Sequence, residues 1–259
     1  MLIAEVRGRV GCRLAGGIEA PGGAAIGRDL GELAGGGSMG LAVGSDAAAL
    51  FVASDVIIDF TTPEASINHA RLAASLGKPL VIGTTGFDSR QHQLLAEAAT
   101  QTPLLWSANM SPAVTLLTML VEEATKRLGP DYDIEVLEMH HRHKVDAPSG
   151  TALALGRAAA GVLGVDLDAV SERVRDGRPG ARRQGAIGFA SLRGGDVVGD
   201  HSVIFAGPFD RLELTHRAAN RQLFAAGAVR AAWWLARQPP GLYGMREVLG
   251  FSPGTRKDP

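Results

Sequence analysis

Short apolar runs alternate with helix-forming stretches along the first half of the chain. Residues 56–60, 79–83 and 103–106 are rich in β-branched and apolar side chains, which predicts three buried strands. Each run is followed by a stretch with helical signals. The first two helices should end near residues 76 and 99, and the third should cover residues 112–128. Repeated β-α units of this spacing predict an α/β fold with a Rossmann-like, doubly wound parallel sheet.

Small polar residues follow each of these predicted strands. In open parallel sheets, ligands bind beyond the carboxyl ends of the strands, so these loops are candidate parts of a cofactor groove. Small residues also make tight turns, and for any single loop that simpler explanation stays open. The candidate cofactor contacts are Gly83, Thr84, Thr85, Ser107, Ala108, Asn109 and Met110.

The pattern changes after residue 133. Strand-like runs cover residues 133–139, 186–192, 202–206 and 211–216. They predict an antiparallel or mixed sheet with one face available for contacts between subunits. A helix expected over residues 220–237 can return to the first domain. We therefore expect a dinucleotide-binding domain of residues 1–110 and 220–259, and a substrate-binding and oligomerisation domain of residues 111–219. The loop over residues 173–183 is dense in arginine, glycine and proline, and we expect it to be mobile.

Candidate chemistry is concentrated between residues 138 and 152. Three of the seven histidines (His140, His141 and His143) and one of the four lysines (Lys144) lie in this segment. The strand over residues 133–139 should deliver His140 and His141 at its end.

Immediately afterwards the sequence predicts the start of a helix. Ser149 suits the N-cap, and Gly150 and Thr151 suit the first turn, whose unpaired N–H groups attract anions. His141, Lys144 and this helix start can therefore converge on one anionic ligand, while His140 or Lys144 supplies a proton.

Two simpler interpretations compete with this one. A histidine-rich stretch can ligate zinc, but the chain has one cysteine, Cys12, and no second ligand cluster, so we expect no metal site. Arg142, His143 and Asp146 can instead form a solvated ionic loop, the usual fate of charges between elements.

Composition narrows the class of partner. The chain has 259 residues and a formal net charge of -1, which gives no basic field for nucleic acid. A single cysteine excludes a disulfide framework and fits a reducing compartment. Apolar runs stay shorter than the roughly 18 residues of a membrane span, and the first residues lack a signal-peptide pattern. We therefore expect a cytoplasmic protein whose partner is a small molecule, not nucleic acid or a membrane.

The segment from Glu138 to Ala152 closely resembles the signature of the dihydrodipicolinate reductases, bacterial enzymes of lysine and diaminopimelate biosynthesis. The resemblance extends from about Arg13 to Phe251. Supporting runs, in chain order, are residues 31–35, 58–61, 81–87, 109–111, 193–196 and 199–201.

The resemblance implies reduction of a cyclic unsaturated imino dicarboxylate, 4-hydroxy-tetrahydrodipicolinate or dihydrodipicolinate, to tetrahydrodipicolinate by NADH or NADPH. His140 and Lys144 match the acid/base positions of the family. Substrate-binding positions are matched by His141, Ser149, Gly150 and Thr151. The family likeness also implies a homotetramer built through the second domain.

The start of the chain departs from the family pattern. A domain of this kind should begin with a strand, a glycine loop and a helix. Leu2, Ile3, Val6 and Val10 instead recur at helical spacing, Gly11 suits the end of that helix, and residues 13–19 predict the next strand. The chain is therefore expected to start inside the first helix. Either the true start lies roughly 20 residues upstream, the length that a strand and glycine loop require, or the protein is a natural truncation with weakened cofactor binding.

Two residues bear on cofactor choice. Glu19 matches the acidic ribose ligand of the family, and Ala20 stands where members that grip the 2′-phosphate of NADP often carry arginine. Losing that cation favours NAD, although use of both cofactors stays open. Two alternative functions also stay open: a truncated, catalytically impaired homologue, or a related nicotinamide-dependent oxidoreductase of another imino or amino acid.

Overall fold

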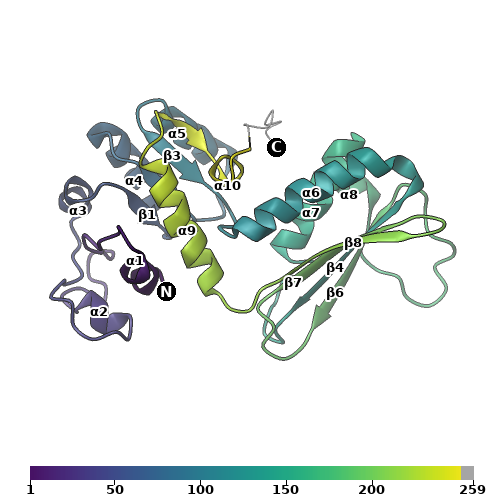
Figure 1. Ribbon diagram of the computed structural model, residues 1–259, viewed down its shortest axis with the longest axis horizontal. Coiled ribbons are helices and arrows are strands. Elements are labelled where there is room, and N and C mark those ends of the chain that lie inside the picture. The colour runs from purple at the N-terminus through teal and green to yellow at the C-terminus, as the bar shows by residue number, and fades with distance from the viewer. Residues whose placement is uncertain (252–259) are drawn as a thin grey trace. The chain divides into compact units, whose positions relative to one another are not determined.

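A computed structural model describes residues 1–251 (Figure 1). The chain divides into two compact units. In the described range, the first unit comprises residues 1–112 and 222–251 and the second comprises residues 113–221. Among residues 1–251, none of the helices has the length and apolar character needed to cross a bilayer. The biochemical roles expected of the two units remain predictions.

The first unit contains the predicted parallel sheet. Its strands are β1 (Ile57–Asp59), β2 (Leu80–Ile82), β3 (Pro103–Trp106) and β9 (Gly241–Tyr243), all parallel, in the order β1-β2-β3-β9. The helices of this unit are α1 (Leu2–Gly8), α2 (Leu30–Leu33), α3 (Ala47–Ala53), α4 (Pro63–Leu76), α5 (Ser89–Ala99), α9 (Gln222–Leu235) and α10 (Met245–Val248). The first three predicted strands and the helices after the first two of them are thus confirmed, and the helix after the third, α6 (Pro112–Leu128), is present in the second unit.

Both faces of this sheet are covered, as the near-continuous apolar strands require. Leu80 and Ile82 pack on one face with residues of α3, α4 and α5. Val81 and Leu105 point to the other face, where they pack with α9 and α10. Alternate side chains of these strands pack on opposite faces of the sheet. The strands are therefore held from both sides, and their carboxyl ends form a fixed edge.

The first 20 residues confirm one prediction and correct another. The helix α1 is present, but Val10 lies outside it and is 97% exposed. Residues 13–19, expected to be a strand, form only a single parallel bridge between Ile18 and Gly44. Glycines at positions 16 and 17 weaken the strand tendency of this segment. Two hydrogen bonds, Gly44 N to Gly17 O and Glu19 N to Gly44 O, make up the pairing.

The second unit contains the predicted mixed sheet. Its strands are β4 (Asp133–His140), β5 (Ser171–Glu172), β6 (Ile187–Arg193), β7 (Asp200–Ala206) and β8 (Arg211–Arg217), in the order β5-β6-β4-β7-β8. The strand β4 is parallel to β6 and antiparallel to β7. Its helices are α6 (Pro112–Leu128), α7 (Gly150–Leu163) and α8 (Leu167–Val170), with the 3₁₀ turn Gly129–Asp131 before β4.

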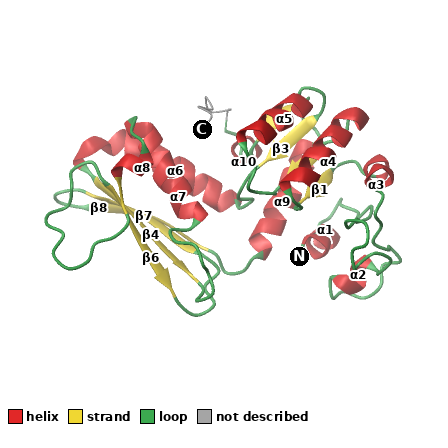
Figure 2. Cartoon of the chain, turned by 180° about the vertical axis from the view of Figure 1, so that it is seen from behind, coloured by secondary structure: helices red, strands yellow, loops and turns green. Residues whose placement is uncertain are grey.

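The helices of the second unit lie on one face of its sheet (Figure 2). Alternate residues of β4, among them Ile134 and Val136, are buried against α6 and α7. Residues of the opposite parity, such as Leu137 and Met139, point to the other face and are partly exposed, and Leu192 of β6 is 48% exposed. No helix of residues 1–251 is seen on this second face, which is called the open face below (Figure 2).

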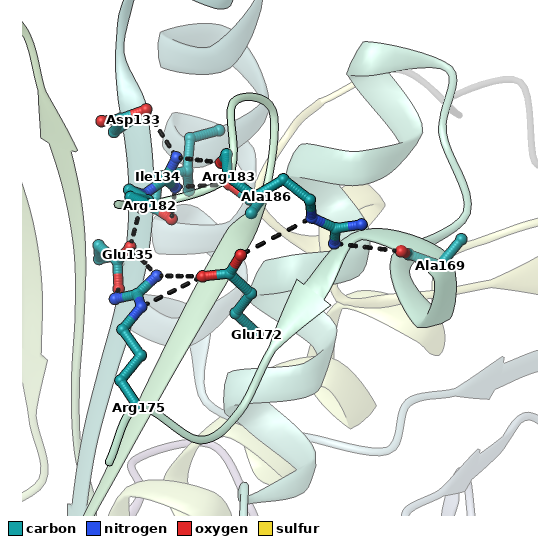
Figure 3. A network of polar contacts seen from close by, with 9 residues as sticks. All are labelled: Asp133, Ile134, Glu135, Ala169, Glu172, Arg175, Arg182, Arg183 and Ala186. Atoms are coloured by element: carbon teal, nitrogen blue, oxygen red, sulfur yellow. Dashed lines mark hydrogen bonds and ion pairs between the residues drawn. The ribbon is translucent and has the colours of Figure 1, made fainter. Parts of the chain in front are cut away.

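Ion pairs fasten the arginine-rich loop, which its composition led us to expect to be mobile (Figure 3). Arg182 donates to Glu135 of β4, and it also donates to three carbonyl oxygens. Arg175 donates to both oxygens of Glu135, at 2.8 Å each, and to Glu172 of β5. Arg183 adds a longer pair with Glu172. The loop is thus anchored to β4 and β5 by charge-assisted bonds, which are the stronger class of hydrogen bond.

Candidate active site

The end of β4 places two titratable side chains inside the second unit. Side chains alternate along a strand, so Glu138 and His140 share the inner face with the core residues of β4. Glu138 is 1% exposed and His140 is 9% exposed. The predicted strand end at His140 is confirmed.

Glu138 is fully paired. Its Oε1 accepts hydrogen bonds from Arg193 Nη2 at 2.9 Å and from Ser149 N at 3.2 Å. Its Oε2 accepts from Arg193 Nη1 at 2.9 Å and lies 2.5 Å from His140 Nδ1. Burial alone would raise the pKa of Glu138, but the bonds from Arg193 and His140 hold that pKa below its ordinary value. The carboxyl group is therefore an ionised acceptor.

His201 of β7 lies behind this pair. Its ring centroid is 5.0 Å from that of His140, nearly edge to face, and its Nε2 lies 2.9 Å from Ser149 Oγ. Burial, followed by the nearby charge of His140, lowers the pKa of His201 to about 4. His201 is therefore neutral at physiological pH.

The helix start predicted at Ser149 is confirmed. Ser149 Oγ accepts from Ala152 N at 3.1 Å, which caps α7. Gly150 is exposed, and a Cβ built on it would meet no atom within 4 Å. The first turn of a helix carries partial positive charge and N–H donors, so the open space beside Gly150 suits an anion. Thr151, partly exposed, follows in the same turn.

Lys144 sits in the turn between β4 and α7. Its side chain is 19% exposed, and its Nζ donates to the two carboxylate oxygens of Asp146 at 2.7 and 2.9 Å. The hydrogen bond from Lys144 lowers the pKa of Asp146. Arg193 Nη2 donates to the Asp146 carbonyl oxygen at 2.7 Å, so the turn is tied to the Glu138 pair.

The remaining side chains of the segment are at the surface. His141 is partly exposed and has Arg221 Nη2 3.5 Å from its Nε2. Arg142 and His143 are exposed, as the solvated-loop interpretation expects for them. Within residues 1–251, no group of three histidine, cysteine or acidic side chains is arranged to hold a metal ion.

In the first unit, the three loops at the carboxyl ends of β1, β2 and β3 are bonded to one another. Thr84 Oγ1 accepts from Thr61 N at 3.0 Å, and Trp106 Nε1 donates to Thr84 O at 3.0 Å. Ser107 N donates to Ile82 O at 3.1 Å. The predicted loops therefore form one continuous edge. Thr84 is 5% exposed and turned inward, so its hydroxyl fixes the loops.

Exposure separates the candidate cofactor residues. Thr85 and Ala108 are exposed, and Gly83, Ser107 and Asn109 are partly exposed, along this edge. Asn109 Oδ1 accepts from Ser111 N at 2.8 Å, which bends the loop after β3. Met110 is 2% exposed and packs with α9, so its side chain belongs to the core, and a cofactor contact at this position would have to come from its backbone.

The edge fits a nicotinamide cofactor in part. A Cβ on Gly86 would meet nothing within 4 Å, so the loop after β2 leaves room for a ligand. Glu19 and Ala20 are exposed just beyond the Ile18 bridge, where a ribose ligand is expected. The Gly8–Gly11 run supplies no phosphate loop. Gly8 ends α1, and a Cβ on Gly11 would lie 2.9 Å from the Trp233 ring.

Sequence reasoning missed the buried layer of the site. Glu138, Arg193 and His201 were seen only as parts of family-like runs, with no role assigned. The register Glu138↔His201 between β4 and β7 and the pairing His140↔Arg193 between β4 and β6 bring them together. The sequence offered one signal for this layer. Glu138 is an acidic residue on the apolar face of a predicted strand, and a buried acid requires a partner.

Comparisons with known proteins cover both units. The family model "Dihydrodipicolinate reductase, N-terminus" matches residues 1–110, and "Dihydrodipicolinate reductase, C-terminus" matches residues 113–249. A 4-hydroxy-tetrahydrodipicolinate reductase of Halorhodospira halophila is 50% identical over 250 residues, which is 96% of this chain and 94% of the relative. One of Magnetococcus marinus is 51% identical over 251 residues, 97% and 94% of the two chains.

A solved structure gives the same result. The dipicolinate-bound dihydrodipicolinate reductase of Paenisporosarcina sp. TG-14 superposes with a TM-score of 0.74 at 25% identity, covering 95% of this chain and 92% of that one. The matches span both units and include the segment from Glu138 to Ala152. The chain therefore belongs to the dihydrodipicolinate reductase family.

Proposed function

We propose that this protein reduces 4-hydroxy-tetrahydrodipicolinate, or its dehydrated form dihydrodipicolinate, to tetrahydrodipicolinate with NADH or NADPH, in lysine and diaminopimelate biosynthesis. The observation that carries the proposal is the grouping of His140, Lys144 and the amino end of α7 at one end of the second sheet. This grouping offers a proton and an anion site together, as an unsaturated dicarboxylate requires.

Once the hydroxylated form has lost its 4-hydroxyl group as water, the reaction adds a hydride and a proton across a conjugated C=C–C=N unit. A bound nicotinamide would supply the hydride to one end of this unit, and the atom at the far end would then need a proton from the protein. His140 and Lys144 are the proposed proton donors. Lys144 also brings positive charge close to a substrate carboxylate, and its ion pair with Asp146 holds the ammonium group within this turn.

The substrate carboxylates are assigned to the rim of the same site. Gly150 and Thr151 offer the first-turn amides of α7, Ser149 fixes that turn, and His141 adds a side-chain donor. On the cofactor side, the exposed residues Thr85 and Ala108, with their loop neighbours, would hold the nicotinamide, and Glu19 the ribose. Ala20 supplies no cation for a 2′-phosphate, which favours NADH.

Two measurements test the activity. The purified protein is titrated with NADH and with NADPH, and binding is followed by fluorescence. The substrate is then generated enzymatically, and its consumption is measured with each cofactor. We expect binding of NADH, turnover, and inhibition by dipicolinate. Failure to bind either nucleotide supports an impaired homologue. Binding without turnover or dipicolinate inhibition supports an oxidoreductase for another imino or amino acid.

Gly150→Ala tests the anion site. The added methyl group meets no atom of the protein, and alanine is the better helix former, so stability should be unchanged or slightly raised. The methyl group would occupy the space assigned to a carboxylate. We expect KM for the substrate to rise about tenfold, the effect of losing about 1.4 kcal/mol of binding. Gly161→Ala, also in α7 and also free of contacts, is the matched control. Equal KM values in the two variants would place the carboxylate elsewhere.

We also propose that the protein is cytoplasmic. We propose further that it forms a homotetramer through the open face of the second sheet. Leu137, Met139 and Leu192 give that face an apolar character, and a single cysteine, Cys12, suits a reducing compartment. Sedimentation equilibrium should give four times the 27.0 kDa chain mass. A Leu192→Glu variant should dissociate, and a monomeric wild type would contradict the proposal.

A further inference from the structure

One buried carboxylate has no part in the reaction assigned above. Glu138 is 1% exposed, carries its charge in the interior, and reaches the proposed carboxylate rim only through the bond that it accepts from the Ser149 amide. An ionised group in such a place is costly unless it is paired. Arg193 pairs it through two parallel N–H bonds of 2.9 Å, and the Ser149 amide adds a third, so the carboxylate is held from three sides.

This arrangement determines which nitrogen of His140 carries a proton. An ionised carboxylate only accepts hydrogen bonds, so the 2.5 Å contact requires a proton on His140 Nδ1. That holds whether the imidazole is neutral or charged. In neutral His140 the bare nitrogen is therefore Nε2, and Nε2 is the atom through which His140 can take up and release a proton.

Gly199, immediately before β7, keeps that nitrogen clear. A Cβ at this position would lie 2.9 Å from His140 Nε2 and 3.5 Å from His201 Cε1. The His140 ring has little freedom to move aside, because Nδ1 is bonded to Glu138 and the ring packs against His201. The Gly199 carbonyl in turn accepts from Ala218 N at 3.1 Å, which fixes its backbone beside β8.

We propose that Glu138, clamped by Arg193, is the positioning residue of His140 and directs Nε2 toward the reacting atoms, and that Gly199 is the position that leaves Nε2 accessible. The proposal rests on the function proposed above, in which His140 exchanges a proton. The charged and titratable neighbours of His140 are Glu138 on β4, Arg193 on β6, His201 on β7, and Lys144 with Asp146 in the following turn.

Glu138→Gln is the first test. Its side chain keeps the shape of glutamate but loses the charge, and it no longer imposes one tautomer. We expect kcat to fall about 10- to 100-fold, as for other supporting hydrogen-bond partners. The pH profile of kcat/KM should differ from that of the wild type, because the proton-exchanging site loses a neighbouring negative charge. Affinity for NADH should stay the same.

Nitrogen-15 spectra of the histidine rings test the same point without turnover. The His140 signal, identified by its absence in His140→Gln, should show a protonated Nδ1 in the wild type and mixed tautomers in Glu138→Gln. If the wild type has no reductase activity, the proposed function fails while this measurement still decides the role of Glu138. A wild-type His140 protonated at Nε2 when neutral would overturn the proposal. So would an unchanged pH profile in a folded, active Glu138→Gln enzyme.

Gly199→Ala gives an independent measurement if Glu138→Gln does not fold. The methyl group should lower kcat at least tenfold while Nδ1 of His140 stays protonated, because Glu138 is intact. Gly161→Ala controls for an added methyl group in a helix, and because Gly199 has a φ of 158°, the thermal midpoint of each variant is recorded beside its activity to separate backbone strain from the loss of clearance. Wild-type kcat in a folded Gly199→Ala protein would refute the clearance role.

Discussion

Replacing Lys144 with alanine will lower turnover by about 10²- to 10⁴-fold, the usual contribution of a positioned proton donor. The ammonium group is held by Asp146 in the turn that joins β4 to α7, on the same unit as His140. Affinity for NADH should remain within about twofold, because the candidate cofactor loops belong to the other unit and make no use of this charge. Single-turnover rates and fluorescence titration give the two quantities separately.

Lys126→Ala is the control for this variant. Lys126 is exposed near the end of α6 in the same unit, so its loss changes the net charge equally and touches none of the site. It should behave as the wild type. Equal losses of turnover and nucleotide affinity in Lys144→Ala would move Lys144 into the cofactor site and end its assignment as a proton donor.

Acidification from pH 6.5 to 4.5 will destabilise the second unit through His201 and His216. The pKa of His201 is lowered from 6.5 to about 4, chiefly by burial, and burial also lowers the pKa of His216 on the neighbouring strand. In the unfolded chain both rings return to their ordinary values. Below pH 6.5 the unfolded state therefore binds more protons than the folded state, and the free energy of unfolding falls as the pH falls.

The full contribution of His201 corresponds to about 3 kcal/mol at pH 4, from roughly 1.4 kcal/mol per unit of pKa difference. Urea denaturation followed by far-ultraviolet circular dichroism, at intervals of half a pH unit, measures it. His201→Gln, which can still bond Ser149 Oγ, should flatten the curve above pH 4.5, before the carboxylates titrate. The exposed His143→Gln is the matched control. A His201→Gln curve parallel to that of the wild type would refute the assignment.

Local patterns predicted the elements of this fold well. The apolar runs that became β1, β2 and β3 and the cap at Ser149 depend on neighbours in sequence, and all are present. The predicted strand over residues 13–19 was wrong because strand formation also depends on a partner that is distant in sequence. Its residues look like a strand, but a strand needs a partner of similar length, and only Gly44 pairs with Ile18.

The exposed chemistry of the site was predictable and its buried support was not. His140, Lys144 and Ser149 lie within ten residues of one another, so one segment reveals them. Arg193 and His201 reach Glu138 from strands more than 50 residues away, through a register that no local pattern specifies. The ion pairs of the arginine-rich loop could not be predicted for the same reason, since their partner Glu135 lies on a distant strand.

Ser149 joins β4, α7 and β7 through one residue, and this has a consequence for engineering. Its amide bonds Glu138, and its hydroxyl both caps α7 and bonds His201. Substitutions of Glu138, Ser149 and His201 would have to be made together, because each of these residues forms a hydrogen bond with another of them. Libraries intended to alter which acid this scaffold accepts should therefore vary the solvent-facing positions His141, Gly150 and Thr151 and leave the interior of the second unit as it is.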